Sequence, residues 1–240
     1  MALRRVPSHG YAACWYMGME TNRNAALYQG EFANRQDAGR RLAKALSRYQ
    51  DQQPIVLALP RGGVPVGFEI ARALAAPLDV LLVRKLRAPG YPELGIGAVV
   101  DGADPQRILN ESIIESLQVS ADYIEQEVRE QLQIIEERKR RYRGGRPPLA
   151  LAGRTVILTD DGIATGGTVR AGLKALALAG AGRTVLAVPV APDETMRALA
   201  GAADDVVCLL SLANFHAVGF FYADFAQTTD DEVIELLQRQ

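Results

Sequence analysis

The stretch VILTDDGIATGGT, residues 156–168, decides the fold of this chain. Its opening apolar residues predict a buried strand, which ends at two adjacent acids, Asp160 and Asp161. The glycines that follow permit a tight turn with exposed backbone N–H groups, and a helix is expected to begin at about residue 167. A strand, a turn and a helix N-terminus in this order form a site suited to a phosphate group. The motif G-x-x-x-x-G-K-S/T of nucleotide triphosphatases is absent from the sequence.

The two carboxylates need a different partner, because like charges repel and neither acid can bind the phosphate. They are expected to accept hydrogen bonds from hydroxyl groups, or to hold a cation through water. The stretch therefore predicts a ligand with a phosphate at one end, vicinal hydroxyls beside it and a bound magnesium ion. Ribose 5-phosphate has this arrangement.

Strand and helix patterns alternate on both sides of this stretch. Buried strands are predicted at 55–59, 79–86, 154–160, 183–190 and 205–210. Helices are predicted at 34–49, 64–76, 120–143, 168–181 and 193–202, and a last helix is expected after an N-cap at Thr229. This order indicates an α/β fold with an open, mostly parallel five-stranded sheet and helices on both faces.

The unusual loops all follow predicted strands, at the sheet edge where ligands of such folds bind. They are PRGG (60–63), the Pro- and Gly-rich segment 86–105, the DDGIATGGT loop and the aromatic segment 212–228. We expect segment 86–105 to be a flexible loop, with a short antiparallel ribbon through GIGAVVDG as the alternative.

Composition narrows the class of protein. A net charge of −1 over 240 residues argues against a general nucleic-acid-binding protein, which usually carries a basic face. No apolar run reaches the roughly 20 residues that a membrane helix needs. Cys14 and Cys208 lie far apart in sequence, which favours a reduced, cytoplasmic protein. Residues 1–27 are expected to form a disordered tail, or to precede a true start at Met17 or Met19, and residues 28–240 to form one domain.

Residues 156–168 resemble the phosphoribosyl-pyrophosphate (PRPP) signature of the type I phosphoribosyltransferases: an apolar strand, two acids and a small-residue loop ending in TGGT. The resemblance extends over most of residues 30–230, and the whole chain is similar to a group of stand-alone bacterial members without an assigned substrate. It implies a Mg²⁺-dependent transfer of ribose 5-phosphate from PRPP to a nitrogenous base, with release of pyrophosphate. It also implies a homodimer.

The resemblance assigns roles to particular residues. Asp160 and Asp161 would bind the ribose hydroxyls, and with Arg61 and Lys85 they form the expected catalytic set. The 5-phosphate would lie on Ala164, Thr165, Gly166, Gly167 and Thr168. Pyrophosphate would be bound by Arg61, Gly62, Gly63, Arg84 and Lys85. Arg87 lies just inside the expected flexible loop, where Glu93 either helps to order the loop or the substrate or is a solvated acid.

The sequence gives weaker evidence for the residues that would bind the acceptor base. Ala164 stands where the 6-oxopurine enzymes of this family carry an aspartate, which argues against a hypoxanthine or guanine enzyme and is compatible with the adenine branch. FHAVGFFYADF (215–225) resembles the hood of the 6-oxopurine enzymes, with the spacing off by one residue. Phe215, Phe220 and Asp224 are therefore candidates for the base site, with core and surface packing as the alternative, and His216 is expected to be a loop residue.

A second function class remains open, a non-catalytic regulatory protein of the same fold that binds PRPP or a nucleotide. Such a protein could dispense with the pyrophosphate-binding residues. Because this chain retains the PRGG turn and the basic residues after strand 79–86, the sequence favours the enzyme.

Overall fold

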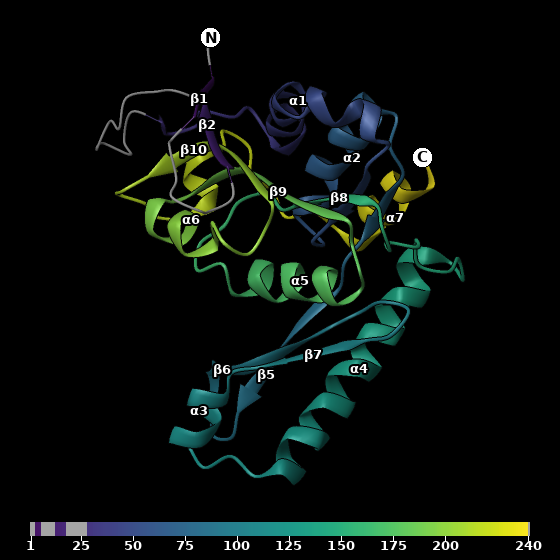
Figure 1. The fold of residues 1–240 in the computed structure, drawn as a ribbon, viewed down its shortest axis with the longest axis vertical. Helices are drawn as coiled ribbons and strands as arrows, with labels where there is room; N and C mark the ends of the chain where they lie inside the picture. Colours follow the sequence, from purple (N-terminus) through teal and green to yellow (C-terminus); the bar gives the residue numbers. More distant parts are fainter. Residues whose placement is uncertain (1–2, 6–12, 18–27, 240) are drawn as a thin grey trace.

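The structure is a computed structural model that describes residues 3–5, 13–17 and 28–239 (Figure 1). Its strands are β1 (Leu3–Arg5), β2 (Ala13–Met17), β3 (Ile55–Ala58), β4 (Leu78–Val80), β5 (Val83–Ala88), β6 (Tyr91–Val100), β7 (Gln106–Leu109), β8 (Thr155–Thr159), β9 (Arg183–Pro192) and β10 (Asp205–Leu212). Its helices are α1 (Arg35–Ala45), η2 (Ser47–Gln52), α2 (Gly63–Leu74), α3 (Glu111–Ser116), α4 (Ala121–Arg143), α5 (Gly167–Leu178), α6 (Asp193–Leu199), η3 (Val218–Phe221) and α7 (Asp230–Gln238). None of the helices formed by these residues is both long enough and apolar enough to cross a membrane.

The main sheet has the strand order β1-β2-β10-β9-β8-β3-β4. From β2 to β4 every pairing is parallel, and β1 runs antiparallel to β2. The five-stranded parallel sheet predicted from the sequence is confirmed. Strands β1 and β2 extend it beside β10 and fall within residues 1–27, the expected tail; the other residues of that segment lie outside the described part of the chain.

Helices cover both faces of the sheet, with α1 and α2 on one face and α5 on the other (Figure 1). All four residues of β3 are buried, as expected for a parallel strand with both faces covered. One core cluster joins α1 and α2 to the sheet, and a second joins α5 and α6 to it. The carboxyl ends of β3 and β8, which pair in register from Ile55↔Val156 to Ala58↔Thr159, therefore present their loops side by side.

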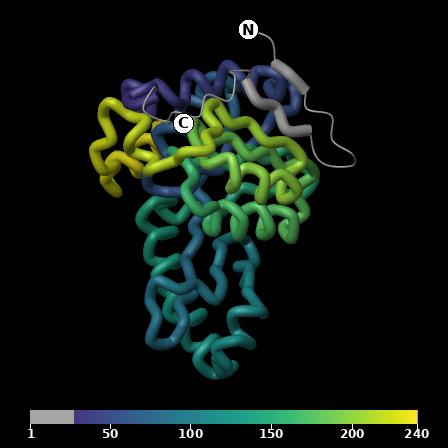
Figure 2. The backbone as a smooth tube through the Cα atoms, turned by 90° about the vertical axis from the view of Figure 1, so that its left-hand side faces the viewer, coloured from purple at the N-terminus to yellow at the C-terminus, as the bar shows by residue number. Residues whose placement is uncertain are grey.

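A second lobe projects from the sheet (Figure 2). It consists of an antiparallel ribbon, β5-β6-β7, backed by α3 and α4. The single strand predicted at 79–86 is therefore wrong: β4 ends at Val80 and β5 begins at Val83 in a different sheet. Most of segment 86–105 is regular strand, in agreement with the ribbon alternative. Its Ile96 and Val99 are buried in the same core cluster as Ile124 of α4, and this apolar contact explains why the segment is not a loop.

A buried ion cluster joins the projecting lobe to the sheet. Arg143, the last residue of α4, donates from Nε to both oxygens of Asp79 on β4, at 3.0 and 2.9 Å, and from Nη1 to Asp101 Oδ2 at 2.7 Å. All three side chains are at most 9% exposed. Burial raises the pKa of Asp101, and the Arg143 charge opposes that shift. Separating α4 from the sheet would leave these buried charges without partners, which is costly. The cluster therefore fixes where α4 meets the sheet.

Candidate functional site

The loop between β8 and α5 is held by contacts with β9 and α6. The Ile163 N–H donates to Val190 O (2.9 Å), and Thr195 Oγ1 donates to Ala164 O (2.8 Å). Gly166 caps α5 with φ +75°, and a Cβ at this position would lie 2.8 Å from Thr195 Cγ2. Only glycine satisfies both the backbone angle and the close approach. Ala164, Thr165, Gly167 and Thr168 are exposed, so the unpaired N–H groups of the first helical turn face outward.

The acid pair lies where β8 ends. Asp160 Oδ1 accepts a hydrogen bond from the Asp161 N–H at 2.9 Å. Burial raises the pKa of both carboxyls, and that of Asp160 is raised further by the negative charge of Asp161. Two adjacent acids in a desolvated position are costly unless a hydroxyl, a cation or a basic side chain compensates them. The pair is therefore arranged to bind hydrogen-bond donors.

The turn after β3 lies against this pair. A Cβ atom on Gly62 would lie 2.0 Å from Asp161 Oδ2, and one on Gly63 would lie 2.9 Å from Asp160 Cα. The Pro60–Arg61 peptide bond is cis. The Gly63 N–H already donates to Leu59 O at 3.0 Å, which leaves the Gly62 N–H as the glycine donor of this turn. Arg61 extends toward α7, with Nη1 3.9 Å from Asp230 Oδ1.

The sequence analysis did not identify Arg35, the first residue of α1. Its Nε donates to Asp161 Oδ2 at 2.8 Å, and its Nη1 donates to Ala226 O at 2.7 Å. The guanidinium carbon lies 3.9 Å from the centre of the Phe225 ring. The hydrogen bond and the charge of Arg35 both counteract the burial that raises the pKa of Asp161. Nothing in the spacing indicates this contact, because the two residues are 126 positions apart.

Tyr222, also absent from the sequence-based candidates, contacts Asp161 from the aromatic segment 212–228, which we call the hood. Its hydroxyl donates to Asp161 O at 2.6 Å, and its ring stacks on Phe225 with centroids 5.0 Å apart. Burial, followed by the charge of Asp161, raises the pKa of this phenol, which keeps it a hydrogen-bond donor at neutral pH. Arg35 and Tyr222 thus hold Asp161 from two sides.

Arg84 and Lys85 of β5 point to opposite sides of the ribbon, as neighbours in a strand do. Lys85 lines a cavity of about 500 Å³ between the ribbon and α5, together with Thr165, Gly167 and Thr168 from the start of α5 and the loop before it. Its ammonium donates to Glu93 O at 2.6 Å. Arg84 lies on the α4 side, where Nε donates to Gln131 Oε1 at 3.0 Å. The structure therefore places Lys85, and not Arg84, beside the loop.

The hood candidates separate into two groups. Phe215 and Phe220 both pack on Phe221, with ring centroids 5.4 and 5.5 Å apart, and both belong to the edge of a small core cluster. His216 is exposed and lies against Phe220. Asp224 is exposed, accepts from the Ala226 N–H at 3.0 Å, and lines a second cavity.

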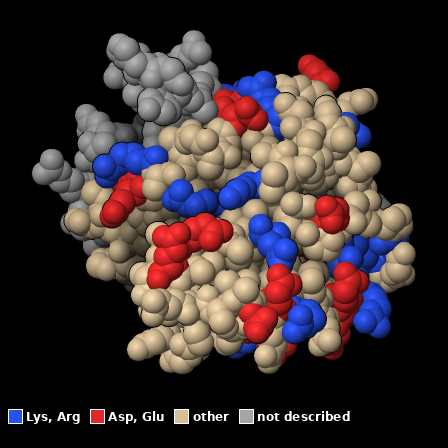
Figure 3. Space-filling view, turned by 60° about the horizontal axis from the view of Figure 1, so that its bottom comes forward, with Lys and Arg blue, Asp and Glu red and all other residues tan. Residues whose placement is uncertain are grey.

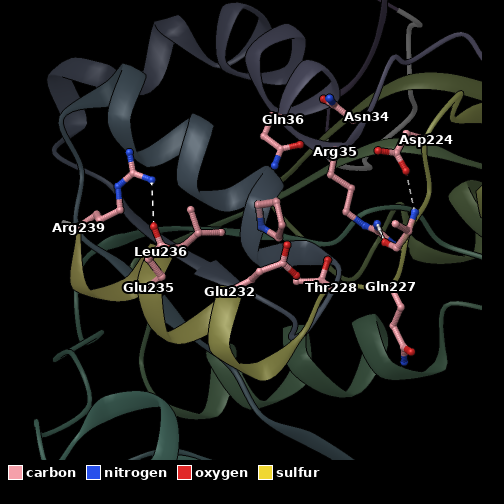
Figure 4. Close-up of a pocket in the computed structure, with 12 residues that line it drawn as sticks. Asn34, Arg35, Gln36, Asp224, Gln227, Thr228, Glu232, Glu235, Leu236 and Arg239 are labelled. Atoms are coloured by element: carbon pink, nitrogen blue, oxygen red, sulfur yellow. Dashed lines mark hydrogen bonds and ion pairs between the residues drawn. The ribbon is translucent and has the colours of Figure 1, made fainter.

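That second cavity, of about 260 Å³, is polar and lies between the hood, α1 and α7 (Figure 4). Arg35 reaches from α1 toward Ala226 and Asp224 at one side of it, and Gln36 points into it from the same helix. Arg35 lines this cavity and also forms an ion pair with Asp161. One side chain therefore connects the cavity to the acid pair.

Comparison with known proteins identifies the family. Residues 29–220 match the phosphoribosyl transferase domain. A Mycobacterium tuberculosis (strain H37Rv) protein named "Putative phosphoribosyl transferase Rv0571c" is 47% identical over 208 residues, which cover 87% of this chain and 46% of that protein. The chain thus spans about half the length of the curated relatives it matches. The crystal structure of TT1426 from Thermus thermophilus has a TM-score of 0.77 at 42% identity, covering 87% of this chain and 98% of that one. With its acid pair, its TGGT loop and its parallel sheet, the chain belongs to the type I phosphoribosyltransferase family.

Proposed function

We propose that the protein is a Mg²⁺-dependent phosphoribosyltransferase, which moves ribose 5-phosphate from PRPP to a nitrogenous base and releases pyrophosphate. The observation that carries this proposal is the direct contact between the Gly62 turn and the Asp161 carboxylate, next to an open phosphate loop. These parts match the three sections of PRPP: a 5-phosphate, a ribose with two free hydroxyls and a pyrophosphate.

The loop and the acid pair would hold the sugar. The backbone of the exposed residues Ala164, Thr165, Gly167 and Thr168 and the positive end of α5 favour a 5-phosphate. Asp160 and Asp161 would accept hydrogen bonds from the two ribose hydroxyls. Arg35 strengthens this function because it keeps Asp161 oriented and favours its ionised form. Fixing the ribose at both ends would orient its anomeric carbon for an incoming base.

The turn at 60–63 would bind the leaving pyrophosphate through the Gly62 N–H and the Arg61 side chain. Arg61 is 37% exposed and its ion-pair distance to Asp230 is long, so it is free to turn toward a polyanion. Lys85 lies beside the loop and could approach the same ligand, whereas Arg84 would first have to leave Gln131. Positive groups here would stabilise the charge that develops on pyrophosphate as its bond to the sugar lengthens.

The acid pair also fits a magnesium ion bound in the usual way, through one or two carboxylates, water and substrate phosphates. The described residues contain no cluster of three or more His, Cys, Asp or Glu side chains that would bind a metal without a substrate. When bound together with PRPP, Mg²⁺ would supply positive charge to the pyrophosphate oxygens. We also propose a cytoplasmic homodimer, by resemblance to the family.

The alternative is a non-catalytic regulatory protein that binds PRPP or a nucleotide on the same loop. The retained turn and its contact with Asp161 favour the enzyme, since a sensor of the 5-phosphate alone does not need them. Two residues bear on which base is the acceptor. Ala164 offers no carboxylate to a purine. Asp224, a candidate for the base site, lines a cavity together with Arg35.

Pyrophosphate release tests the proposal. PRPP and Mg²⁺ are supplied with purine, pyrimidine and pyridine bases, one at a time, and release that depends on one base is expected. Asp161→Asn and Arg61→Ala should each abolish turnover while circular dichroism and melting temperature stay near those of the wild type. If calorimetry shows PRPP binding but no base gives release, the regulatory alternative takes the place of the enzyme.

A further inference from the structure

The cavity between α5 and the ribbon extends well beyond the phosphate loop. At about 500 Å³ it is within the size range of small-molecule sites. One wall carries Arg170 and Lys174 of α5, and the other carries apolar residues of the ribbon, among them Val83, Ala98 and Ile108. A single phosphate in the loop would leave most of this volume to another group or another molecule.

The charges around this cavity are unbalanced. Lys85, Arg170 and Lys174 line it, and Glu111 is its one acidic lining residue among the described part of the chain. Among the described residues, neither Arg170 nor Lys174 has an ion-pair partner. Figure 3 shows that basic and acidic side chains are interspersed over the face that it presents. A cleft with Arg170 and Lys174 on the helix wall and Lys85 beside apolar residues on the ribbon wall concentrates a positive potential, which an anion would neutralise.

Helix geometry places Lys174 away from the loop that precedes α5. Arg170 and Lys174 are one turn apart, so both side chains can reach a single group. With a rise of about 1.5 Å per residue, Lys174 lies about 10 Å along the axis from Gly167, and Arg170 lies about 4.5 Å from it. Lys174 therefore marks a second position in the cavity, and Arg170 lies between that position and the start of the helix.

We propose that Arg170 and Lys174 form a second phosphate subsite, which binds the phosphate group of a small molecule whose apolar body packs against the ribbon. A guanidinium and an ammonium one helical turn apart offer the charge-assisted donors that phosphate oxygens accept. The site lies on the side of α5 that lines the cavity and does not depend on phosphoribosyl transfer. A ligand bound there would contact β5, β6 and α5 together and would connect the projecting lobe to the phosphate loop.

The test uses phenyl phosphate, which combines a phosphate with a small apolar body, in calorimetric titrations at low salt. Ribose 5-phosphate is first added to saturation so that the loop is occupied. We expect phenyl phosphate to bind under these conditions, and Lys174→Gln to weaken its binding about tenfold by removing one charge-assisted contact. Arg129→Gln, which removes an exposed charge from α4 outside the cavity, is the matched control and should leave the affinity unchanged.

Three results would overturn the proposal: no binding of phenyl phosphate to the loaded protein, no effect of Lys174→Gln, or an equal loss in Arg129→Gln. Failure of the proposed function has a different signature. If ribose 5-phosphate itself does not bind while phenyl phosphate binds in a Lys174-dependent manner, the assignment of the phosphate loop fails and the second subsite stands.

Discussion

Replacing Gly62 by alanine is the smallest change that separates the turn at 60–63 from the acid pair. The new methyl carbon would lie 2.0 Å from Asp161 Oδ2, and Cβ atoms essentially never approach within 3.0 Å of another heavy atom. The carboxylate or the turn must therefore move by at least about 1 Å. The oxygen cannot retreat freely, because Arg35 Nε binds the same atom at 2.8 Å.

The expected loss follows from the contact that this displacement removes. A hydrogen bond between a carboxylate and a ribose hydroxyl contributes about 1.5–3 kcal/mol, so the affinity for PRPP should fall by about 10- to 100-fold. Calorimetric titration with PRPP and Mg²⁺ measures this without knowledge of the acceptor base. Gly201→Ala is the control, since nothing lies within 4 Å of a Cβ there. Wild-type affinity in a folded Gly62→Ala protein would refute the contact as part of the ligand site.

Three further substitutions test other parts of the structure. Arg35→Gln removes the charged donor to Asp161, so the Kd for PRPP should rise about tenfold, with partial recovery in Arg35→Lys. An unchanged Kd would show that Arg35 does not position Asp161 for PRPP. Arg143→Met leaves two buried carboxylates without their cation and should lower the free energy of unfolding in urea by about 3–5 kcal/mol; a loss below about 1 kcal/mol would contradict the ion cluster. Hydrogen bonding from Tyr142 and nearby arginines lowers the pKa of Asp230, so its carboxylate stabilises the fold at neutral pH. The higher melting temperature of the wild type over Asp230→Asn should therefore disappear as the pH falls through that lowered pKa, below the usual range of an aspartate, and a difference that persists there would exclude this origin.

The sheet could be predicted because its strands are uniformly apolar and lie between helical patterns, so that every residue pattern agrees with the fold. The ribbon was harder to identify, since its glycines and prolines are typical of loops. Its strand character comes from Ile96 and Val99, which pack on α4, and that helix begins more than 20 residues later in the sequence. The break between β4 and β5 gave no signal either, because the apolar run VLLV (80–83) continues across it.

The candidate site likewise combines residues that the sequence could predict with residues that it could not. Asp160, Asp161, Gly62 and the phosphate loop are local motifs, and the structure brings them together where two paired strands end. Arg35 and Tyr222 could not be inferred, because their contacts with Asp161 depend on how α1 and the hood fold back over the sheet. Arg84 and Lys85 are adjacent in sequence, and only the orientation of the ribbon decides that Lys85 faces the loop.

A crystal structure of the protein with PRPP and Mg²⁺ would test the central claim most directly. We predict the 5-phosphate on the backbone N–H groups of residues 164–168, the ribose hydroxyls within hydrogen-bond distance of Asp160 and Asp161, and the pyrophosphate at the Gly62 turn. A PRPP molecule bound elsewhere, or one whose ribose does not touch either acid, would contradict the proposed site and the mechanism derived from it.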